Sequence, residues 1–315
     1  MNNSTSQIIF LKPAFIRKLW GSQKLATNFN FDLPKNTPIG EAWLVSAHPN
    51  GMSYVLNGKY QGLSLADLFQ QYPNLFGNID STGHIINKEY PLLTKILDAN
   101  DSLSVQIHPD DEFAKKNYQF LGKTECWYIL DCLPKAKIIL GHNAKTKEQF
   151  KQWIEKGQWN KLLKYVPIKK DQFIYVPSLK IHGLLAHTIV FELQQSSDIT
   201  YRLYDYDRKD EFGNLRKLHL QEASEIVLIP DKNSSEASAH DNYLVDNSFF
   251  KLIKIVNIGK KQYSYPNTRW LQISVLDGNG IIDDNNIKKG DSFILTNGYN
   301  VFSLVGEMLL MIAYC

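Results

Sequence analysis

The chemistry of this chain is most visible where polar side chains recur at every second position of strand-like sequence. In one such run, Ser104, Gln106 and His108 alternate with two β-branched apolar residues. Because successive side chains of a strand point to opposite faces, these three polar groups share a face. Polar groups on a short buried strand are costly unless they line a solvated or metal-filled cavity. The pattern therefore predicts a polar cavity against this strand.

Three further segments carry polar side chains that could face the same cavity. They are Lys123, Glu125 and Trp127 on the next strand-like run, His182 after a later turn, and Glu192, Asp198 and Arg202 along a third stretch. The members of each set share a face by the same alternation, provided that no bulge interrupts the third stretch. We expect the three segments to contribute to one site.

Two histidines, one glutamate and one glutamine stand out in these segments: His108, His182, Glu125 and Gln106. A mixed set of nitrogen and oxygen ligands suits a divalent transition metal. Each residue also has an ordinary interpretation, because strand histidines are often hydrogen-bonded structural residues and strand glutamates often lie on a solvated face. The spacing alone leaves a metal site and a structural polar cluster both open.

Short strands with turn residues between them must position these side chains. Runs of β-branched and aromatic residues bounded by Asn, Gly, Pro or Asp recur along the chain, without strand–helix alternation or a Gly-rich phosphate loop. Helical patterns occur near residues 63–72, where Ser64 and Asp67 form a capping-box-like turn, and near 146–165. We therefore expect a mainly β protein of jelly-roll barrels, which limit exposed strand edges, with short helical insertions.

A polar stretch at residues 231–241 predicts a linker between two β domains. We expect a larger catalytic domain over residues 1–235, which carries the helical insertions. A smaller all-β domain is expected over residues 236–315.

The composition excludes several classes of protein. The 315 residues are 43% hydrophobic and carry a formal net charge of +3 without a long basic run, which argues against a disordered chain and against a nucleic-acid partner. Cys126, Cys132 and Cys315 are odd in number and lack metal-ligand spacing, which indicates a reducing compartment. The apolar runs are too short for a signal peptide or a bilayer span. We expect a soluble cytoplasmic protein with no membrane partner.

Several long motifs resemble the short bacterial form of the type I mannose-6-phosphate isomerases. The matching segments run in order between about Trp20 and His219 and include GEAWLVSAHPNG, PLLTKILDANDSLSVQIHPDD, GKTECWYIL and ELQQSSDITYRLYDYDR. The resemblance implies a cupin-type jelly-roll barrel with a smaller C-terminal β domain. It also implies an enzyme, dependent on one zinc or another divalent ion per chain, that interconverts mannose 6-phosphate and fructose 6-phosphate.

The resemblance assigns roles to residues of this chain. It implies that the metal ligands are Gln106, His108, Glu125 and His182, that Arg202, Glu192 and Lys123 are catalytic, and that Lys95, Ser104, Asp198, Trp20 and Glu41 bind substrate. The implied reaction moves a proton between C1 and C2 of a sugar phosphate through an enediol, and a metal can polarise the carbonyl oxygen.

Two of these roles have alternatives. Arg202 offers a fixed cation for the growing charge or for the phosphate, or else forms a structural pair with Asp198 or Asp205. Candidates for the base are Glu192, a metal-bound water, and a lysine of depressed pKa, and the residues leave this choice open.

The loop before His182 departs from the family pattern. The family usually has Gly-Thr where this chain has Leu179-Lys180. Because leucine disfavours the left-handed backbone that glycine allows, we expect this loop to follow another path, or the activity to have changed. We also expect Lys180 to bring a bulky cation near the mouth of the pocket.

Two other functions stay open. The same scaffold could serve an isomerase of another sugar phosphate, or a non-catalytic metal-binding cupin that acts as a sugar sensor. The presence of Arg202, Lys123 and Glu192 favours an enzyme, because a binding module has no need of an acid–base set.

Overall fold

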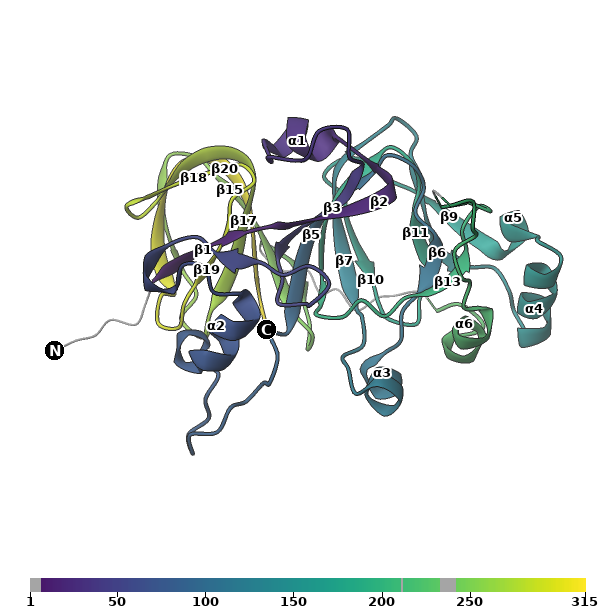
Figure 1. The fold of residues 1–315 in the computed structure, drawn as a ribbon, viewed down its shortest axis with the longest axis horizontal. Coiled ribbons are helices and arrows are strands. Elements are labelled where there is room, and N and C mark those ends of the chain that lie inside the picture. The colour runs from purple at the N-terminus through teal and green to yellow at the C-terminus, as the bar shows by residue number, and fades with distance from the viewer. Residues whose placement is uncertain (1–6, 211, 233–241) are drawn as a thin grey trace.

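The computed structural model describes residues 7–210, 212–232 and 242–315, and three antiparallel sheets make up its core (Figure 1). The six-stranded sheet has the order β10 (Phe173–Val176), β7 (Glu125–Cys132), β12 (Thr188–Gln195), β5 (Leu92–Ala99), β3 (Ile39–Val45) and β2 (Ala14–Ser22). The five-stranded sheet has the order β13 (Tyr201–Tyr204), β6 (Val105–Ile107), β11 (His182–Leu184), β8 (Lys137–His142) and β9 (Leu163–Pro167).

The six-stranded and five-stranded sheets face each other across a shared apolar core. Trp127 and Val190 of the first sheet pack in one buried cluster with Ile138 and Leu184 of the second. Side chains alternate between the two faces along each strand, and those on the opposite face of the six-stranded sheet form a second apolar core. On β12, for example, Phe191 belongs to the core that lies against the third sheet.

The third sheet holds nine strands and takes most of them from the C-terminal part of the chain. Its order is β14 (Tyr243–Asp246), β15 (Lys251–Asn257), β20 (Val301–Tyr314), β17 (Leu271–Ile282), β19 (Ser292–Leu295), β1 (Ile8–Lys12) and β4 (Tyr54–Val55), with β16 (Lys260–Ser264) on β20 and β18 (Asn285–Lys288) on β17. The N-terminal strand β1 pairs with β19, so it lies among the strands drawn in yellow-green (Figure 1). The predicted linker at 231–241 falls largely outside the described residues, and the division at residue 235 stays a prediction.

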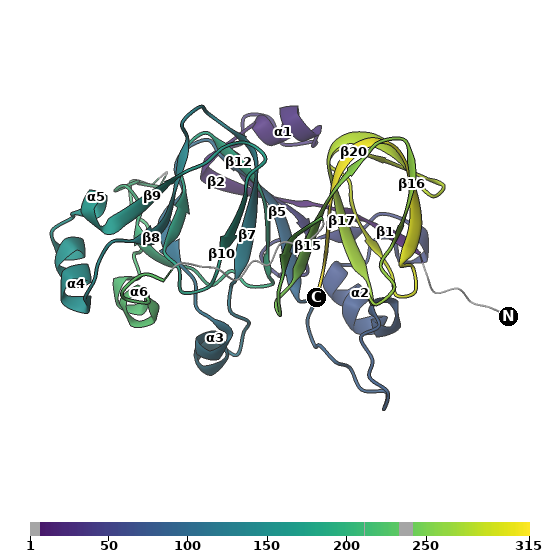
Figure 2. The ribbon, with the colours of Figure 1, turned by 180° about the vertical axis from the view of Figure 1, so that it is seen from behind.

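Short helices cover the ends and one outer face of the sheets (Figure 2). They are α1 (Lys24–Phe29), α2 (Leu65–Gln71), α3 (Asp111–Tyr118), α4 (Lys147–Glu155), α5 (Trp159–Leu162) and α6 (Leu220–Ile226), with the 3₁₀ turns η1 (Gly58–Tyr60) and η2 (Pro73–Phe76). Ser64 caps α2 by accepting a hydrogen bond from the backbone N–H of Asp67, as the sequence predicts. Helices α4, α5 and α6 pack on the outer face of the five-stranded sheet. No helix of the described residues is long and apolar enough to cross a membrane.

Candidate active site

Strand register brings one row of functional side chains together on the inner face of the six-stranded sheet. Lys95 and Trp127 are the direct cross-strand partners of Glu192 on its two sides, and Trp43 is the partner of Lys95. Directly opposed residues of antiparallel strands lie close enough for side-chain contact. Accordingly, Lys95 Nζ lies 3.2 Å from Glu192 Oε1, and Trp127 Nε1 donates a 2.8 Å hydrogen bond to Glu192 Oε2.

A second row crosses the five-stranded sheet. Arg202 and His182 are the cross-strand partners of Gln106 on its two sides. Val105 and Ile107 are fully buried on the opposite face, in the core beneath the helices. The alternation predicted for this strand is therefore confirmed.

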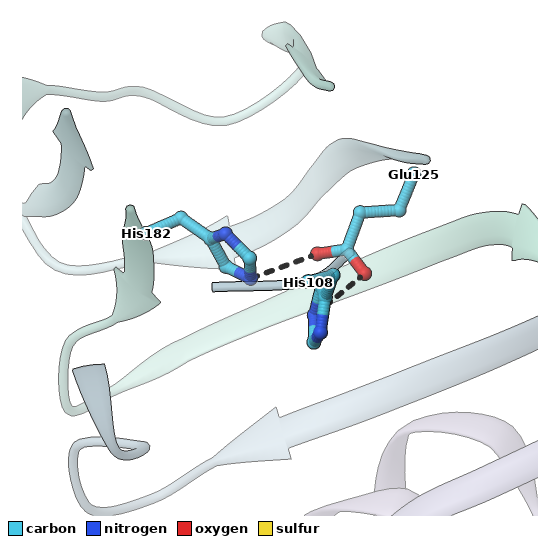
Figure 3. A group of neighbouring side chains, drawn as sticks. All are labelled: His108, Glu125 and His182. Carbon is cyan, nitrogen blue, oxygen red and sulfur yellow. Dashed lines mark ion pairs between the residues drawn. The ribbon is translucent and has the colours of Figure 1, made fainter. Parts of the chain in front are cut away.

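His108, Glu125 and His182 converge in a buried cluster between the two sheets (Figure 3). His182 Nε2 lies 3.3 Å from Glu125 Oε1, and His108 Nε2 lies 3.5 Å from Glu125 Oε2. One ligand atom from each residue falls within 4.8 Å of the others, and the Glu125 side chain is fully buried.

Hydrogen bonds fix which ring nitrogen of each histidine faces Glu125. Nδ1 of His108 lies 2.8 Å from the carbonyl oxygen of Ile199, and Nδ1 of His182 lies 2.8 Å from that of Lys180. A carbonyl oxygen only accepts, so each Nδ1 carries the proton and each Nε2 presents a lone pair. Burial lowers the pKa of His182 to about 4 and that of His108 well below its ordinary value, so both rings are neutral near pH 7.

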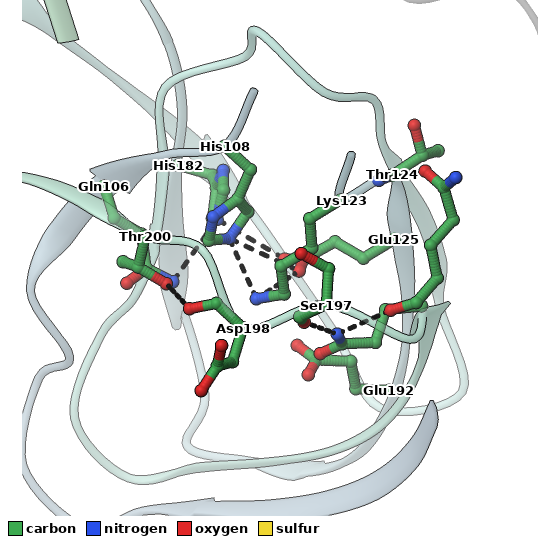
Figure 4. A network of polar contacts seen from close by, with 12 residues as sticks. Gln106, His108, Lys123, Thr124, Glu125, His182, Glu192, Ser197, Asp198 and Thr200 are labelled. Atoms are coloured by element: carbon green, nitrogen blue, oxygen red, sulfur yellow. Dashed lines mark hydrogen bonds and ion pairs between the residues drawn. The ribbon is translucent and has the colours of Figure 1, made fainter. Parts of the chain in front are cut away.

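The cluster therefore gathers electron-pair donors around a small space. Two Nε2 lone pairs and a carboxylate repel one another unless a cation lies among them. Lys123 Nζ supplies one cation, 3.0 Å from both Glu125 Oε2 and His108 Nε2 (Figure 4). The side-chain amide of Gln106 lies 3.4 Å from His182 Nε2 and can offer its oxygen by a simple flip. This donor set fits a divalent metal.

Next to the cluster lies a cavity of about 350 Å³ between the two sheets. All nine predicted pocket residues outside the histidine–glutamate cluster line it: Trp20, Glu41, Lys95, Ser104, Gln106, Lys123, Glu192, Asp198 and Arg202. The structure thus brings the twelve predicted site residues into one region, although their individual roles stay predictions.

Burial and neighbouring charges shift the pKa of two ionisable groups that line the cavity, Glu192 and Lys95. Burial raises the pKa of Glu192, and the nearby Glu125 charge raises it further, against the opposing effect of Lys95. Burial opposes the charge of Lys95 too, but Glu192 and Glu41 outweigh it and raise the pKa of this lysine. A lysine of depressed pKa was one candidate for the base, and in this arrangement Lys95 does not meet that description.

Asp198 lies at the rim of the cavity and is held by two side chains. His48 Nε2 lies 3.4 Å from Asp198 Oδ1, and Asn50 donates a hydrogen bond to Oδ2. Nδ1 of His48 accepts a hydrogen bond from the Asn50 backbone, so its Nε2 is the nitrogen that donates. The hydrogen bond from His48 lowers the pKa of Asp198 to about 2.

This depressed pKa predicts an acid-dependent contribution of Asp198 to stability. The contribution is present above the ordinary aspartate pKa of 3.8 and is lost as the pH falls through about 2. We expect the melting temperature of the wild type to fall more steeply than that of Asp198→Asn between about pH 5 and pH 2. Thermal unfolding followed by circular dichroism measures both curves. Parallel curves would contradict the assignment.

Two guanidinium groups reach the cavity. Arg202 Nη1 donates a 2.9 Å hydrogen bond to the carbonyl of Lys217, and its buried Nε has no hydrogen-bond partner among the residues described. Arg216 instead binds Asp205 through Nε, at 2.6 Å. Within the described ranges, Arg202 forms no ion pair with Asp198 or Asp205, the two partners that a purely structural role would require.

Comparison with known proteins places the chain in a family. A model of the type I phosphomannose isomerase catalytic domain matches residues 8–131. The probable mannose-6-phosphate isomerase GmuF of Bacillus subtilis is 43% identical over 97% of this chain and 98% of its own length. The chain belongs to the type I phosphomannose isomerase family. The mannose-6-phosphate isomerase ManA of the same organism is 40% identical over 96% of this chain and 97% of its own length.

A solved structure of the phosphomannose isomerase family confirms the predicted cupin fold. The crystal structure of the mannose 6-phosphate isomerase from Bacillus subtilis aligns with a TM-score of 0.89 and 37% identity, and covers 98% of this chain and 99% of that one. The family is metal-dependent, and the cluster of His108, Glu125 and His182 could hold a metal.

The loop that departs from the phosphomannose isomerase pattern contradicts two of our expectations. Leu179 has φ 63°, the left-handed conformation that we expected leucine to resist. Its side chain packs against the core beneath α6, and this packing offsets the strain. Lys180 does not approach the mouth of the pocket, because its ammonium is buried against Asp231, 2.7 Å away.

Sequence reasoning missed several residues that line the cavity: Lys18, Trp43, Asn50, Thr200 and Arg216. For two of them, the sequence contained a pattern that could have placed them there. Lys18 stands two residues before Trp20 on β2, and Trp43 two residues after Glu41 on β3, so alternation alone places them on the same faces. Arg216 lies outside any strand, and its place depends on the ion pair with Asp205.

Proposed function

We propose that this chain is a metal-dependent aldose–ketose isomerase that interconverts mannose 6-phosphate and fructose 6-phosphate. One observation carries the proposal: a buried cluster of metal-ligand type adjoins a cavity that presents both a buried carboxylate and fixed cations. Gln106 and Lys123 join the two parts, because both line the cavity and contact the cluster. The full-length relatives that bear the name of this activity support the same conclusion.

We propose that one zinc ion per chain is held by His108, His182 and Glu125, with the amide oxygen of Gln106 as the fourth ligand. Three neutral ligands and one carboxylate leave the site a formal charge of about +1 with zinc. Bound there, zinc would polarise the carbonyl oxygen of the sugar as a Lewis acid.

We propose Glu192 as the group that carries the proton between C1 and C2. Its side chain is buried and faces the cavity, and its raised pKa brings it closer to the operating pH, where a general base is most effective. Lys95 and Trp127 hold both carboxylate oxygens in place. Lys95 stays charged beside them, so it serves better as a binder of hydroxyl groups than as a base.

Cations on the opposite wall would take the negative charges of the substrate. Arg202 is a fixed donor suited to the charge that grows on the enediolate. Arg216, oriented by Asp205, faces the same cavity and would bind the phosphate. Lys123, just before β7 on the same side as Glu192, also lines the cavity, and we propose that it assists the proton transfer.

We propose that the remaining pocket residues hold hydroxyl groups and the sugar ring: Trp20, Glu41, Ser104 and Asp198. A cavity of about 350 Å³ is within the usual range for a small-molecule site. The three cysteines are free, which agrees with the reducing cytoplasm in which we propose that the enzyme works.

A coupled assay tests the proposal. We expect the purified protein to convert mannose 6-phosphate to fructose 6-phosphate and to leave glucose 6-phosphate largely unchanged. Preference for another sugar phosphate would indicate an isomerase of different specificity. Binding of mannose 6-phosphate without any turnover would contradict an enzyme and favour a sugar-binding module.

A further inference from the structure

The loop that delivers His182 is fastened on its far side, away from the cavity. Leu179 donates its backbone N–H to the carbonyl of His108, at 2.8 Å, so this loop contacts the chain at the other histidine of the cluster. The Leu179 side chain points to the core that includes Ile226 of α6. Leu179, in its left-handed conformation, therefore links the loop before His182 to the segment that carries His108.

Lys180 connects the same loop to the segment that follows α6. Its Nζ lies 2.7 Å from Asp231 Oδ1, and the two side chains are only 7% and 10% exposed. Its carbonyl oxygen accepts a 2.8 Å hydrogen bond from the Nδ1–H of His182. One residue therefore makes a buried ion pair with its side chain and orients a metal-ligand imidazole with its backbone.

The neighbouring strand leaves room for this ion pair. Asp231 lies against Gly141 of β8, and a side chain at that position would collide with Oδ2 of the aspartate. The N–H of Gly141 also donates a 2.6 Å hydrogen bond to the carbonyl of Ile181. The backbone after Lys180 is therefore held against β8, where Asp231 docks, and the backbone before it is held by the carbonyl of His108.

We propose that the Lys180–Asp231 ion pair is a positioning pair for the metal ligand His182. By fixing Lys180, the pair keeps its carbonyl where it holds the imidazole with Nε2 turned toward Glu125. Groups that orient a ligand histidine through its second ring nitrogen control metal affinity, although they do not touch the metal. A buried charge that loses its partner is strongly destabilising locally, so removal of either member should move the loop. This inference rests on the metal site of the proposed function.

The test measures zinc affinity, by competition with a chromophoric chelator, in Lys180→Met, Asp231→Asn and the double variant. We expect each single substitution to raise the zinc dissociation constant roughly 10–100-fold. The zinc dissociation constant of the double variant should not exceed the higher of the two single-variant values, because the two residues act as a unit. The visible absorption of the cobalt-substituted protein should change in the same variants, because its intensity reports the ligand geometry.

Lys251→Met is the matched control, because Lys251 forms a 2.9 Å ion pair with Asp246 in the nine-stranded sheet. We expect this variant to keep the wild-type zinc affinity even where its melting temperature falls. Zinc affinities within about twofold of the wild type in both single variants would overturn the inference. So would a double variant whose loss equals the product of the two single losses.

Two further results separate this inference from the proposed function. If Lys180→Met does not fold, the zinc affinity of Asp231→Asn alone tests the positioning role, and a value within about twofold of the wild type would overturn it. A wild-type protein that binds no zinc would contradict the metal site itself. A wild type that binds zinc tightly, beside unaffected variants, would contradict only the positioning role.

Discussion

Loss of the metal abolishes turnover and leaves the barrel folded: this is the result that we expect for His108→Ala, for His182→Ala and for chelation of the wild type. Each alanine variant removes one of the Nε2 donors that face Glu125. The inner core of the barrel contains apolar residues of both sheets, so we expect the fold to survive without the metal. The melting temperature should fall, because a ligand that binds only the folded state stabilises it.

Elemental analysis measures the bound metal, the coupled assay measures turnover, and thermal unfolding measures the melting temperature. His84→Ala is a suitable control, because His84 is exposed in a loop and should keep both zinc and activity. Full activity in metal-free protein would contradict the proposed role of the metal. A variant without zinc that no longer unfolds cooperatively would show instead that the site is needed for folding.

Arg202→Ala should keep its metal and its melting temperature but lose most of its turnover. Interactions that are stronger in the transition state than in the ground state appear in kcat. Removal of a donor of this kind typically costs roughly 10²–10³ in kcat, or about 2.7–4 kcal/mol. Arg202→Lys should recover only part of the loss, because an ammonium lacks the planar fork of donors. Steady-state kinetics of both variants provide the measurement.

Arg17→Ala serves as the control for Arg202, because Arg17 is an exposed arginine of the same barrel. Two results would contradict the assignment in different ways. Normal turnover with a melting temperature several degrees lower would make Arg202 structural. An unchanged kcat with a raised KM would make it a binder of the phosphate rather than of the enediolate.

Alternation along strands accounts for most of the site that could be predicted. It correctly placed Gln106 on the cavity side and Val105 in the core, because the two-residue period of a strand is a local property. Register is not local. The pairing of Glu192 with Lys95 joins strands almost a hundred residues apart, and nothing within either strand specifies it.

The expectations for Leu179 and Lys180 were wrong because tertiary contacts overrode the local preference. Leucine alone avoids a left-handed backbone, but its packing under α6 and its hydrogen bond to His108 keep it there. The ion pair that draws Lys180 away from the cavity involves Asp231, which the sequence indicated only as the start of a linker. Such long-range partners cannot be read from either segment alone.

The position of β1 in the nine-stranded sheet affects how the chain can fold while it is being made. The backbone N–H of Gln7, just before β1, donates to Thr296 Oγ1, which lies 289 residues further along the chain. At roughly 5–20 residues per second, the ribosome needs about 15–60 s to synthesise that distance. Throughout this time β1 has no partner from β19, and its unpaired edge is open to wrong pairing. β1 therefore cannot be secured in the nine-stranded sheet through β19 until nearly three hundred further residues have been synthesised.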